Sequence, residues 1–164
     1  MISRRLIQNF LGLVFLASTS FAFSNTQFTY NLIDGGIEVS GCVDECPDDL
    51  IIPEEIDGYS VVSIGELAFD NIGLTALILP NTLQYIGSWA FLRNQLTTLT
   101  IPTSVIEIGR SAFDLNQLVE VIIPEGVVRI ERAAFGGNML TSIVLPNSLE
   151  YLAGFNSNQI STLN

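Results

Sequence analysis

Residues 64–83 read IGELAFDNIGLTALILPNTL, and the chain repeats this pattern three more times. The later copies start at 22-residue intervals and read IGSWAFLRNQLTTLTIPTSV (86–105), IGRSAFDLNQLVEVIIPEGV (108–127) and IERAAFGGNMLTSIVLPNSL (130–149). Such a period is typical of a solenoid, because one unit cannot bury its apolar side alone and stacks on its neighbours. The sequence therefore predicts a β-rich repeat solenoid.

The last third of each copy has the spacing of a strand. Leu74, Leu77 and Leu79 alternate with other residues before Pro80, and the later copies keep apolar residues at the same places. These side chains are predicted to point inward and to build a parallel sheet with one strand per coil of about 22 residues. Proline then ends each strand, where a missing backbone donor does least harm.

A second apolar set lies at the start of each copy. Ile64, Ala68 and Phe69 have the four- and five-residue spacing of a short helical turn that returns across the core. We expect the ring at each Phe69 position to stack as a spine, and the Asn at the next corner to bond backbone groups of the turn. The first copy has Ile72 at that corner, so we expect this corner to be closed differently. The predicted spine consists of Phe69, Phe91, Phe113, Phe135 and Phe155, with Asn94, Asn116, Asn138 and Asn158.

Residues 1–24 have the layout of a secretory signal peptide. Arg4 and Arg5 precede the apolar run FLGLVFLA (10–17), and small and polar residues follow up to Ser24. The run is too short to span a bilayer, and no later run is long enough. A core element at the N-terminus is the alternative, and the arginine pair leaves Sec and twin-arginine export both open. The sequence predicts a secreted, periplasmic or cell-surface protein with no membrane insertion after cleavage.

Residues 25–49 are predicted to cap the solenoid. FTYNL (28–32) and GIEV (36–39) alternate as strands around the turn signal Asp-Gly-Gly, which predicts a β-hairpin. Cys42 and Cys46 are expected to form a disulfide, since no histidine is present to complete a zinc site. The acids around them, Asp44, Glu45, Asp48 and Asp49, could hold calcium through hard oxygen ligands, but they lack the spacing of a recognised calcium loop.

The solenoid itself is predicted for residues 50–164, with about five coils. The first coil is five residues longer than the others, and the last is shortened and stops partway through a strand. An open last coil would offer a strand edge for self-association. Fraying of this tail, or a sequence that is a fragment, are the alternatives.

The charge is strongly acidic. After removal of the predicted signal peptide, four arginines face 17 Asp and Glu, a net charge of −13. Such a surface repels nucleic acid phosphates and anionic membranes, so no nucleic acid partner is expected. Eleven of these acids lie between Asp34 and Asp70, either as a solvated cap that maintains solubility or as an acidic docking patch.

Strand residues that point outward form the candidate interaction face. One row is polar or small and the next is largely β-branched and apolar, and contiguous exposed apolar area tends to mark interaction sites. The same residues also suit a pleated sheet for structural reasons alone. Two tyrosines form a flanking row that could add anchors. The face comprises Ile78, Thr98, Thr100, Glu120, Ile122, Ser142 and Val144, with Tyr85 and Tyr151 beside it.

The repeats resemble those of the BspA-type leucine-rich repeat family. The shared features are the I-G-x-x-A-F corner, the N-x-L step and a strand ending in I-P, over about 100 residues. The opening segment IPEEIDGYSVVSIG (52–65) resembles that family's longer first coil. The fourth copy departs from the pattern, because Glu131 and Arg132 replace its glycine region. The resemblance implies an exported or surface-displayed protein, in a family in which several members serve in adhesion or protein binding.

Catalysis has little support in the sequence. Without histidine there is no Ser-His-Asp triad, Cys-His pair or histidine metal site, and no phosphate-binding glycine motif occurs. We therefore expect a non-enzymatic binding module, without cofactor or metal, for a protein or glycan ligand. The alternatives are a self-assembling envelope protein and, with less support, a hydrolase that uses two carboxylates in one groove.

Overall fold

The computed structural model describes residues 27–163, which form 14 strands and no helix. The predicted signal peptide, residues 1–24, lies outside these described residues. Nothing between residues 27 and 163 forms a helix with the length and hydropathy that a membrane span requires. The strands are β1 (Phe28–Ile33), β2 (Gly36–Cys42), β3 (Asp49–Ile51), β4 (Glu55–Ile56), β5 (Tyr59–Ile64), β6 (Ala76–Ile78), β7 (Tyr85–Ile86), β8 (Thr98–Thr100), β9 (Glu107–Ile108), β10 (Glu120–Ile122), β11 (Arg129–Ile130), β12 (Ser142–Ile143), β13 (Tyr151–Leu152) and β14 (Thr162–Leu163).

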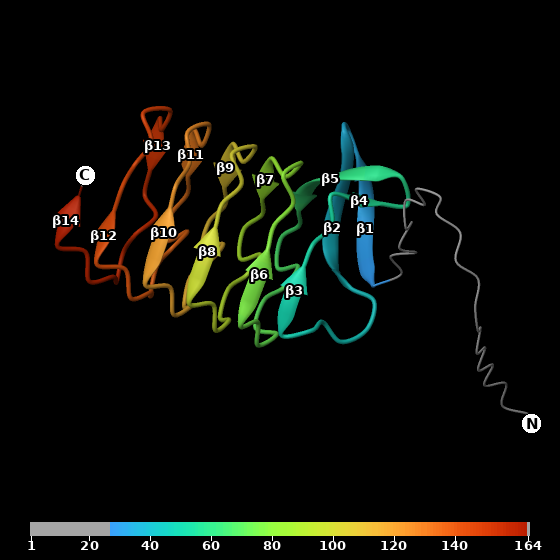
Figure 1. The fold of residues 1–164 in the computed structure, drawn as a ribbon, viewed down its shortest axis with the longest axis horizontal. Helices are drawn as coiled ribbons and strands as arrows, with labels where there is room; N and C mark the ends of the chain where they lie inside the picture. The colour runs from blue at the N-terminus through green and yellow to red at the C-terminus, as the bar shows by residue number, and fades with distance from the viewer. Residues whose placement is uncertain (1–26, 164) are drawn as a thin grey trace, which may run out of the picture.

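The coils stack along one axis as a solenoid with two rows of strands (Figure 1). The first row is one sheet in the order β1-β2-β5-β7-β9-β11-β13, in which β5 to β13 are parallel. The second row contains the parallel pairs β3-β6, β8-β10 and β12-β14, side by side along the molecule. The predicted strand before each proline belongs to this second row. The sequence predicted one strand per coil, and the structure corrects this to two.

The predicted short helical turns are wrong. Leu67, Trp89, Ser111 and Ala133 adopt left-handed backbone angles, with φ between 50° and 60°. A second left-handed residue follows four positions later in each coil, and it is Asn71, Arg93, Leu115 or Gly137. A right-handed helix cannot continue through such residues. The segment is instead a chain of tight turns, whose amides donate to carbonyls of the next coil, as Phe69 N does to Ala90 O at 2.8 Å.

A hairpin covers the N-terminal end of the solenoid. Strands β1 and β2 pair antiparallel, with an irregularity between Thr29 and Tyr30, and β2 then pairs in parallel with β5. The extra residues of the first coil form a small hairpin in which β4 pairs antiparallel with β5. The β1–β2 hairpin therefore covers the strand edge of β5 that the first coil would otherwise expose. Covering an edge in this way is one means by which natural sheets avoid edge-to-edge aggregation.

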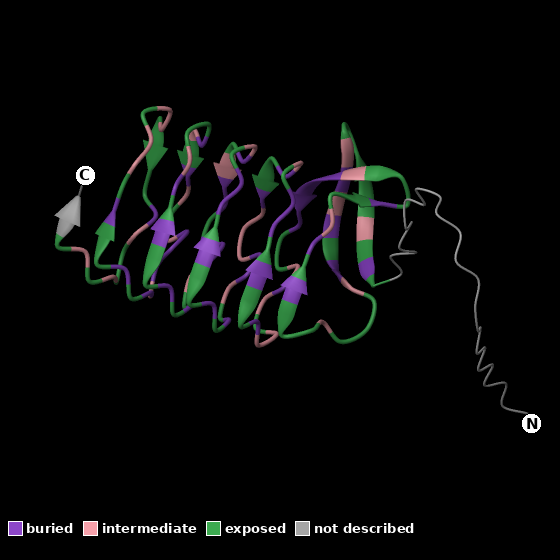
Figure 2. Ribbon diagram, in the orientation of Figure 1, coloured by how far each residue is buried: buried purple, intermediate pink, exposed green. Residues whose placement is uncertain are grey.

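The core is a continuous column of buried side chains between the two rows of strands. Along the strands of the second row, buried residues alternate with exposed ones (Figure 2). Phe69, Phe91, Phe113, Phe135 and Phe155 stack with ring centroids 5.1–5.4 Å apart and interplanar angles of 4–13°. Phe28 from β1 meets the first ring edge-on, with 6.4 Å between centroids. The hairpin thus closes the aromatic column as well as the sheet.

Asparagines connect the coils at one corner. The buried Asn116 side chain accepts the Leu96 N–H at 3.1 Å and donates to the Phe91 carbonyl at 2.9 Å, both in the preceding coil. Asn94, Asn138 and Asn158 repeat this arrangement on Leu74, Leu118 and Leu140. Each side chain satisfies backbone groups that the turns leave without strand partners, and such buried groups are costly when unpaired.

Candidate binding surfaces

The outer surface of the second row of strands carries a line of exposed apolar side chains. Ile51 is 62% exposed, Ile78 58%, Ile122 66% and Val144 59%. Strand pairing aligns Ile51 with Ile78 and Thr100 with Ile122. The 22-residue repeat places Ile78, Thr100, Ile122 and Val144 at equivalent positions of successive coils, so Thr100 interrupts the apolar line. Sequence reasoning missed Ile51, although the Ile-Ile-Pro around it repeats the end of the later strands. Apolar side chains exposed to this extent are available to a partner.

A polar line runs beside the apolar one. Ala76, Thr98, Glu120 and Ser142 are exposed, and Thr98 pairs with Glu120 across β8 and β10. A shallow hollow of about 170 Å³ lies over these two strands and is bordered by Thr98, Thr100, Glu120 and Ile122. The predicted strand residues of the interaction face therefore lie along the second row of strands, which offers apolar contacts and hydrogen-bonding groups side by side. We call this surface the strand face.

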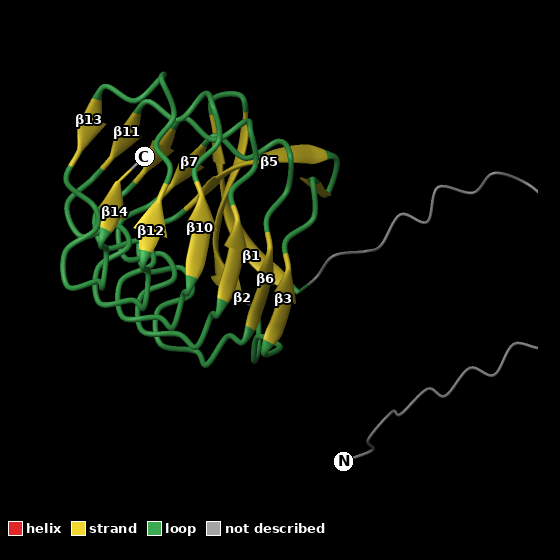
Figure 3. Cartoon of the chain, turned by 60° about the vertical axis from the view of Figure 1, so that its left-hand side comes forward, coloured by secondary structure: helices red, strands yellow, loops and turns green. Residues whose placement is uncertain are grey.

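Tyr85 and Tyr151 do not flank the strand face. They lie on β7 and β13, which belong to the first row of strands (Figure 3). The cause is the second strand of each coil, which the sequence pattern did not reveal and which places these residues in another sheet. In this sheet, register aligns one residue from each of β2, β5, β7, β9, β11 and β13, in the order Glu38, Ser63, Tyr85, Glu107, Arg129 and Tyr151, of which Ser63 is buried. We call this line the tyrosine row.

Arg129 connects three members of this neighbourhood. Its guanidinium carbon lies 4.7 Å from the centroid of the Tyr151 ring, and it donates to the Glu131 carboxylate at 2.6 Å. Its Nε lies 4.0 Å from a Glu107 oxygen, at the limit of an ion pair. The hydrogen bond to Glu131 is the main reason that the pKa of Arg129 is raised. The row thus contains a complete site for a guanidinium, made of an aromatic ring and carboxylates.

A hollow of about 200 Å³ opens at the other end of the tyrosine row. Its lining includes Glu38, Ser63, Tyr85 and Glu107, together with Gly87 and Gly109. The Glu38 carboxylate accepts a hydrogen bond of 3.3 Å from the Ser63 hydroxyl. Glu38 and Glu107 are three strands apart, about 14 Å between backbones.

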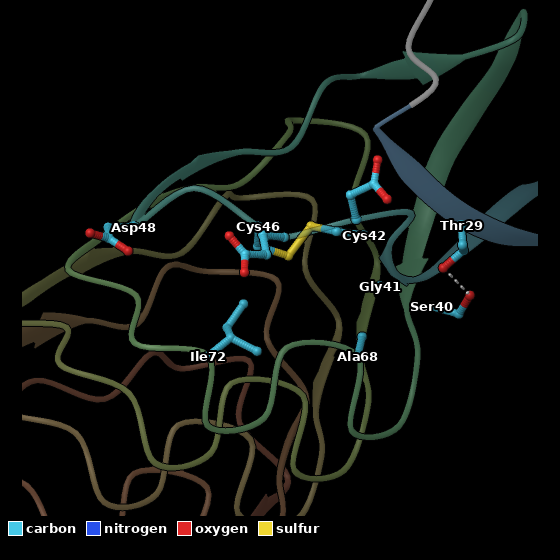
Figure 4. A pocket seen from close by; sticks show the side chains of 10 residues that line it. Thr29, Ser40, Gly41, Cys42, Cys46, Asp48, Ala68 and Ile72 are labelled. Atoms are coloured by element: carbon cyan, nitrogen blue, oxygen red, sulfur yellow. Dashed lines mark hydrogen bonds between the residues drawn. A yellow bond between two sulfur atoms is a disulfide. The ribbon is translucent and has the colours of Figure 1, made fainter. Parts of the chain in front are cut away.

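A third hollow, of about 600 Å³, lies beneath the N-terminal cap (Figure 4). Cys42 and Cys46 form a disulfide on its wall, with Cα atoms 5.6 Å apart, and Ile72 lies on the opposite side. Its acidic lining residues, Asp44, Glu45 and Asp48, are all exposed. No group of three or more His, Cys, Asp or Glu within residues 27–163 could hold a metal ion, so the calcium hypothesis receives no geometric support.

Other polar contacts are structural. The Tyr30 hydroxyl donates to Asp57 at 2.6 Å, which raises the pKa of Tyr30 and links the cap to the β4–β5 turn. Arg93 donates to Asp70 in the preceding coil, and this hydrogen bond raises the pKa of Arg93. These groups are exposed, and their contacts connect neighbouring coils rather than form a cavity.

A family model for the BspA type Leucine rich repeat region, in six copies, matches residues 49–160. The chain belongs to the BspA-type leucine-rich repeat family. The solenoid of this family member has six strands in its second row, β3 to β14, and five intervals between them. A comparison with curated proteins finds no match.

Three solved structures have a similar fold. A leucine-rich repeat protein from Bacteroides ovatus is 26% identical, with a TM-score of 0.68, and the match covers 89% of this chain and 41% of that one. A leucine rich cell surface protein from Faecalibacterium prausnitzii is 21% identical, with a TM-score of 0.53 over 89% of this chain and 55% of its own. A leucine-rich repeat protein of T. pallidum is 20% identical, with a TM-score of 0.50 over 84% and 68%. This repeat protein thus spans less than half the length of the Bacteroides protein.

Proposed function

We propose that this chain is an exported, non-enzymatic binding module that presents the strand face to a protein or glycan ligand, as in adhesion. The observation that carries the proposal is the line of exposed residues across the coils, which is apolar at Ile51, Ile78, Ile122 and Val144 and has Thr100 in the coil between Ile78 and Ile122. Exposed apolar residues scattered singly need no explanation, whereas contiguous ones tend to mark interaction sites. A stack of parallel strands supplies the flat, rigid support that such a surface needs.

The polar line allows the strand face to distinguish between ligands. Thr98, Glu120 and Ser142 place hydroxyl and carboxylate groups beside the apolar line. A ligand that leaves those groups unpaired on burial would lose affinity, because buried polar groups without partners are costly. Leucine-rich repeat proteins generally mediate protein interactions, in agreement with this use of the surface.

The experiment compares three forms of the chain from residue 25 as baits for cell-envelope and extracellular extracts. The first is the native sequence, and the second carries Ile78→Asp and Ile122→Asp. The third carries Leu67→Asp and Leu115→Asp, which are 50% and 54% exposed but lie on the corner turns. Circular dichroism and urea titration establish that all three are folded to the same extent.

We expect one partner to bind the native and corner-substituted baits and to be lost from the strand-face variant. The partner is then identified by mass spectrometry, and the affinity is measured with the purified components. Equal retention by all three baits would exclude the strand face and leave the β-branched residues as sheet formers only. Light scattering of the free protein distinguishes the self-assembling alternative, which predicts a mass that rises with concentration.

Export is proposed from the layout of residues 1–24 and agrees with the cell-surface description of the Faecalibacterium protein. Expression of the full sequence in a bacterial host, followed by N-terminal sequencing of the periplasmic product, tests it. We expect a new N-terminus near Asn25. Retention of Met1 on a protein that stays in the cytoplasm would contradict export.

A further inference from the structure

Within the tyrosine row, the chain's own Arg129 shows how a guanidinium can be bound on this sheet. Arg129 stands one strand before Tyr151, and its guanidinium lies over the tyrosine ring while two carboxylates, Glu131 and Glu107, lie beside it. An arginine over an aromatic face gains from the ring quadrupole, and carboxylates at its edge pair with its N–H groups. The geometry of this sheet therefore suits a guanidinium laid across one strand step.

Tyr85 occupies the equivalent place three coils earlier, but without the arginine. The residue one strand before it is Ser63, whose short side chain donates to Glu38. The cation–π pairs found among residues 27–163 involve Trp89 and Tyr151, not Tyr85. The ion pairs in the same part of the chain involve Asp70, Glu107 and Glu131, not Glu38. Tyr85 is 44% exposed, so its ring is accessible.

Two glycines keep the space beside Tyr85 open. A Cβ on Gly87 would lie 2.6 Å from the Ile64 carbonyl oxygen, and one on Gly109 would lie 2.7 Å from the Ser88 nitrogen. The backbones of adjacent coils therefore approach too closely for a side chain at either position. Gly87 and Gly109 form part of the lining of the hollow of about 200 Å³. In the fourth coil Glu131 stands at the glycine position, and it pairs with Arg129.

The charge of the hollow is negative. Glu38 and Glu107 both line it, in a chain that carries 17 acidic residues. The contact between Glu107 and Arg129 is long, and both side chains are about 40–45% exposed, so it takes up little of the Glu107 charge. The hollow thus has an exposed aromatic wall, a carboxylate next to it and a second carboxylate at the far end.

We propose that the hollow beside Tyr85 binds the arginine side chain of a protein partner. Its guanidinium lies over the Tyr85 ring and pairs with Glu107, and Glu38 adds negative charge at the far end. The site lies in the first row of strands and is separate from the strand face. It supplies a charged anchor to the same or another partner. This proposal does not depend on the function proposed for the strand face.

The test uses the tripeptide acetyl-Gly-Arg-Gly-amide and its citrulline counterpart, which has the same shape without the charge. Both are titrated into the ¹⁵N-labelled chain from residue 25 at low salt. We expect the arginine peptide alone to shift the amide signals of Tyr85, Gly87 and Gly109. Tyr85→Ala should weaken binding about two- to fivefold, the range expected for an exposed cation–π contact, and Glu107→Gln should weaken it as well. Tyr151→Ala is the matched control and should leave the affinity for the hollow unchanged.

A gain-of-site variant makes the test sharper. Arg129→Ala should free the Tyr151 ring and produce a second set of peptide-dependent shifts, around Tyr151 and Leu152. Equal shifts with the citrulline peptide, shifts spread over the acidic cap instead of the hollow, or an unchanged affinity in Tyr85→Ala would each overturn the proposal. Because none of these readouts uses the strand face, failure here leaves the binding-module proposal to its own test.

Discussion

The first corner of the solenoid and the later corners close the same turn in different ways. At the later corners a buried asparagine accepts the N–H of the preceding coil, as Asn94 does from Leu74. At the first corner the equivalent residue is Ile72, which packs against the core and lines the hollow whose other wall carries the disulfide of Cys42 and Cys46. The pairing of Leu50 with Leu77 places Pro47 where Leu74 stands in the next coil.

Pro47 explains the difference. Proline has no backbone N–H, so an asparagine at position 72 would lack the counterpart of the Leu74 N–H that Asn94 accepts. An apolar residue that packs against the core then becomes the better choice, since polar groups buried without partners are unfavourable. The comparison teaches that each asparagine satisfies a backbone N–H of the coil before it. Where that coil has a proline and so no N–H to donate, the chain has an apolar residue instead of asparagine.

The largest effect is expected inside the column that both kinds of corner enclose. Phe113→Ala should lower the free energy of unfolding by about 3–5 kcal/mol, because the ring is fully buried between Phe91 and Phe135 and its removal leaves a cavity. Urea titration followed by circular dichroism measures the loss. Phe155→Ala is the control, and it should cost less because Phe155 is only partly buried. Equal losses at both positions would contradict a column held by burial.

Removal of a ladder asparagine tests the later corners directly. Asn116→Ala should lower the free energy of unfolding by roughly 2–4 kcal/mol, because the Leu96 N–H and the Phe91 carbonyl lose a buried partner. The same titration measures it, and hydrogen exchange of the Leu96 amide should quicken. A loss below the cost of one unpaired group would mean that water replaces the side chain.

The disulfide is the corresponding element of the first corner. Replacement of Cys42 and Cys46 by serine should lower the stability by about 2 kcal/mol, the chain-entropy estimate for so short a ring. Thermal unfolding with and without reductant gives the same comparison on the native chain. If the reduced and oxidised forms unfold together, the cap does not depend on the bridge.

Exchange of one corner type for the other sharpens the contrast. Ile72→Asn would restore the repeat consensus, yet we expect it to destabilise the chain by about 1–2 kcal/mol, because Pro47 offers no N–H to the new side chain. The double variant Ile72→Asn, Pro47→Ala provides that N–H and should recover part of the loss. A stabilising Ile72→Asn single variant would refute the role given to Pro47.

The smallest effect is expected at an exposed turn between coils. The Glu125 carboxylate accepts the backbone N–H groups of Asn147 and Ser148 at 3.0 and 3.3 Å, and the Asn147 bond is the main cause that lowers the Glu125 pKa from its usual 4.5. The stability that it contributes is therefore complete above about pH 4.5 and is lost as the pH falls through the lowered pKa. Glu125→Gln should remove this part of the acid sensitivity, measured by urea titration between pH 3 and 7. An unchanged pH profile would contradict it.

The repeat by itself was sufficient to place much of the interior. A strict interval of 22 residues brings equal positions into one line, so a phenylalanine or asparagine that recurs at that interval must lie over its predecessor. The alternation before each proline likewise separates the inward leucines from the outward residues of the strand face, because successive side chains of a strand point to opposite sides. These features depend on local pattern and on the period alone.

The tertiary structure decided the features that no local alternation of apolar and polar residues reveals. A strand of two residues such as Tyr85–Ile86 leaves no alternation to read, and it exists because neighbouring coils supply its hydrogen bonds. Left-handed turns at Leu67 or Trp89, residues with no intrinsic preference for them, are also held by bonds to the next coil. For this reason the sequence predicted helical turns in their place and put the tyrosines beside the wrong sheet. Which outward rows share a surface, and where a hollow opens between them, depends on how the coils stack.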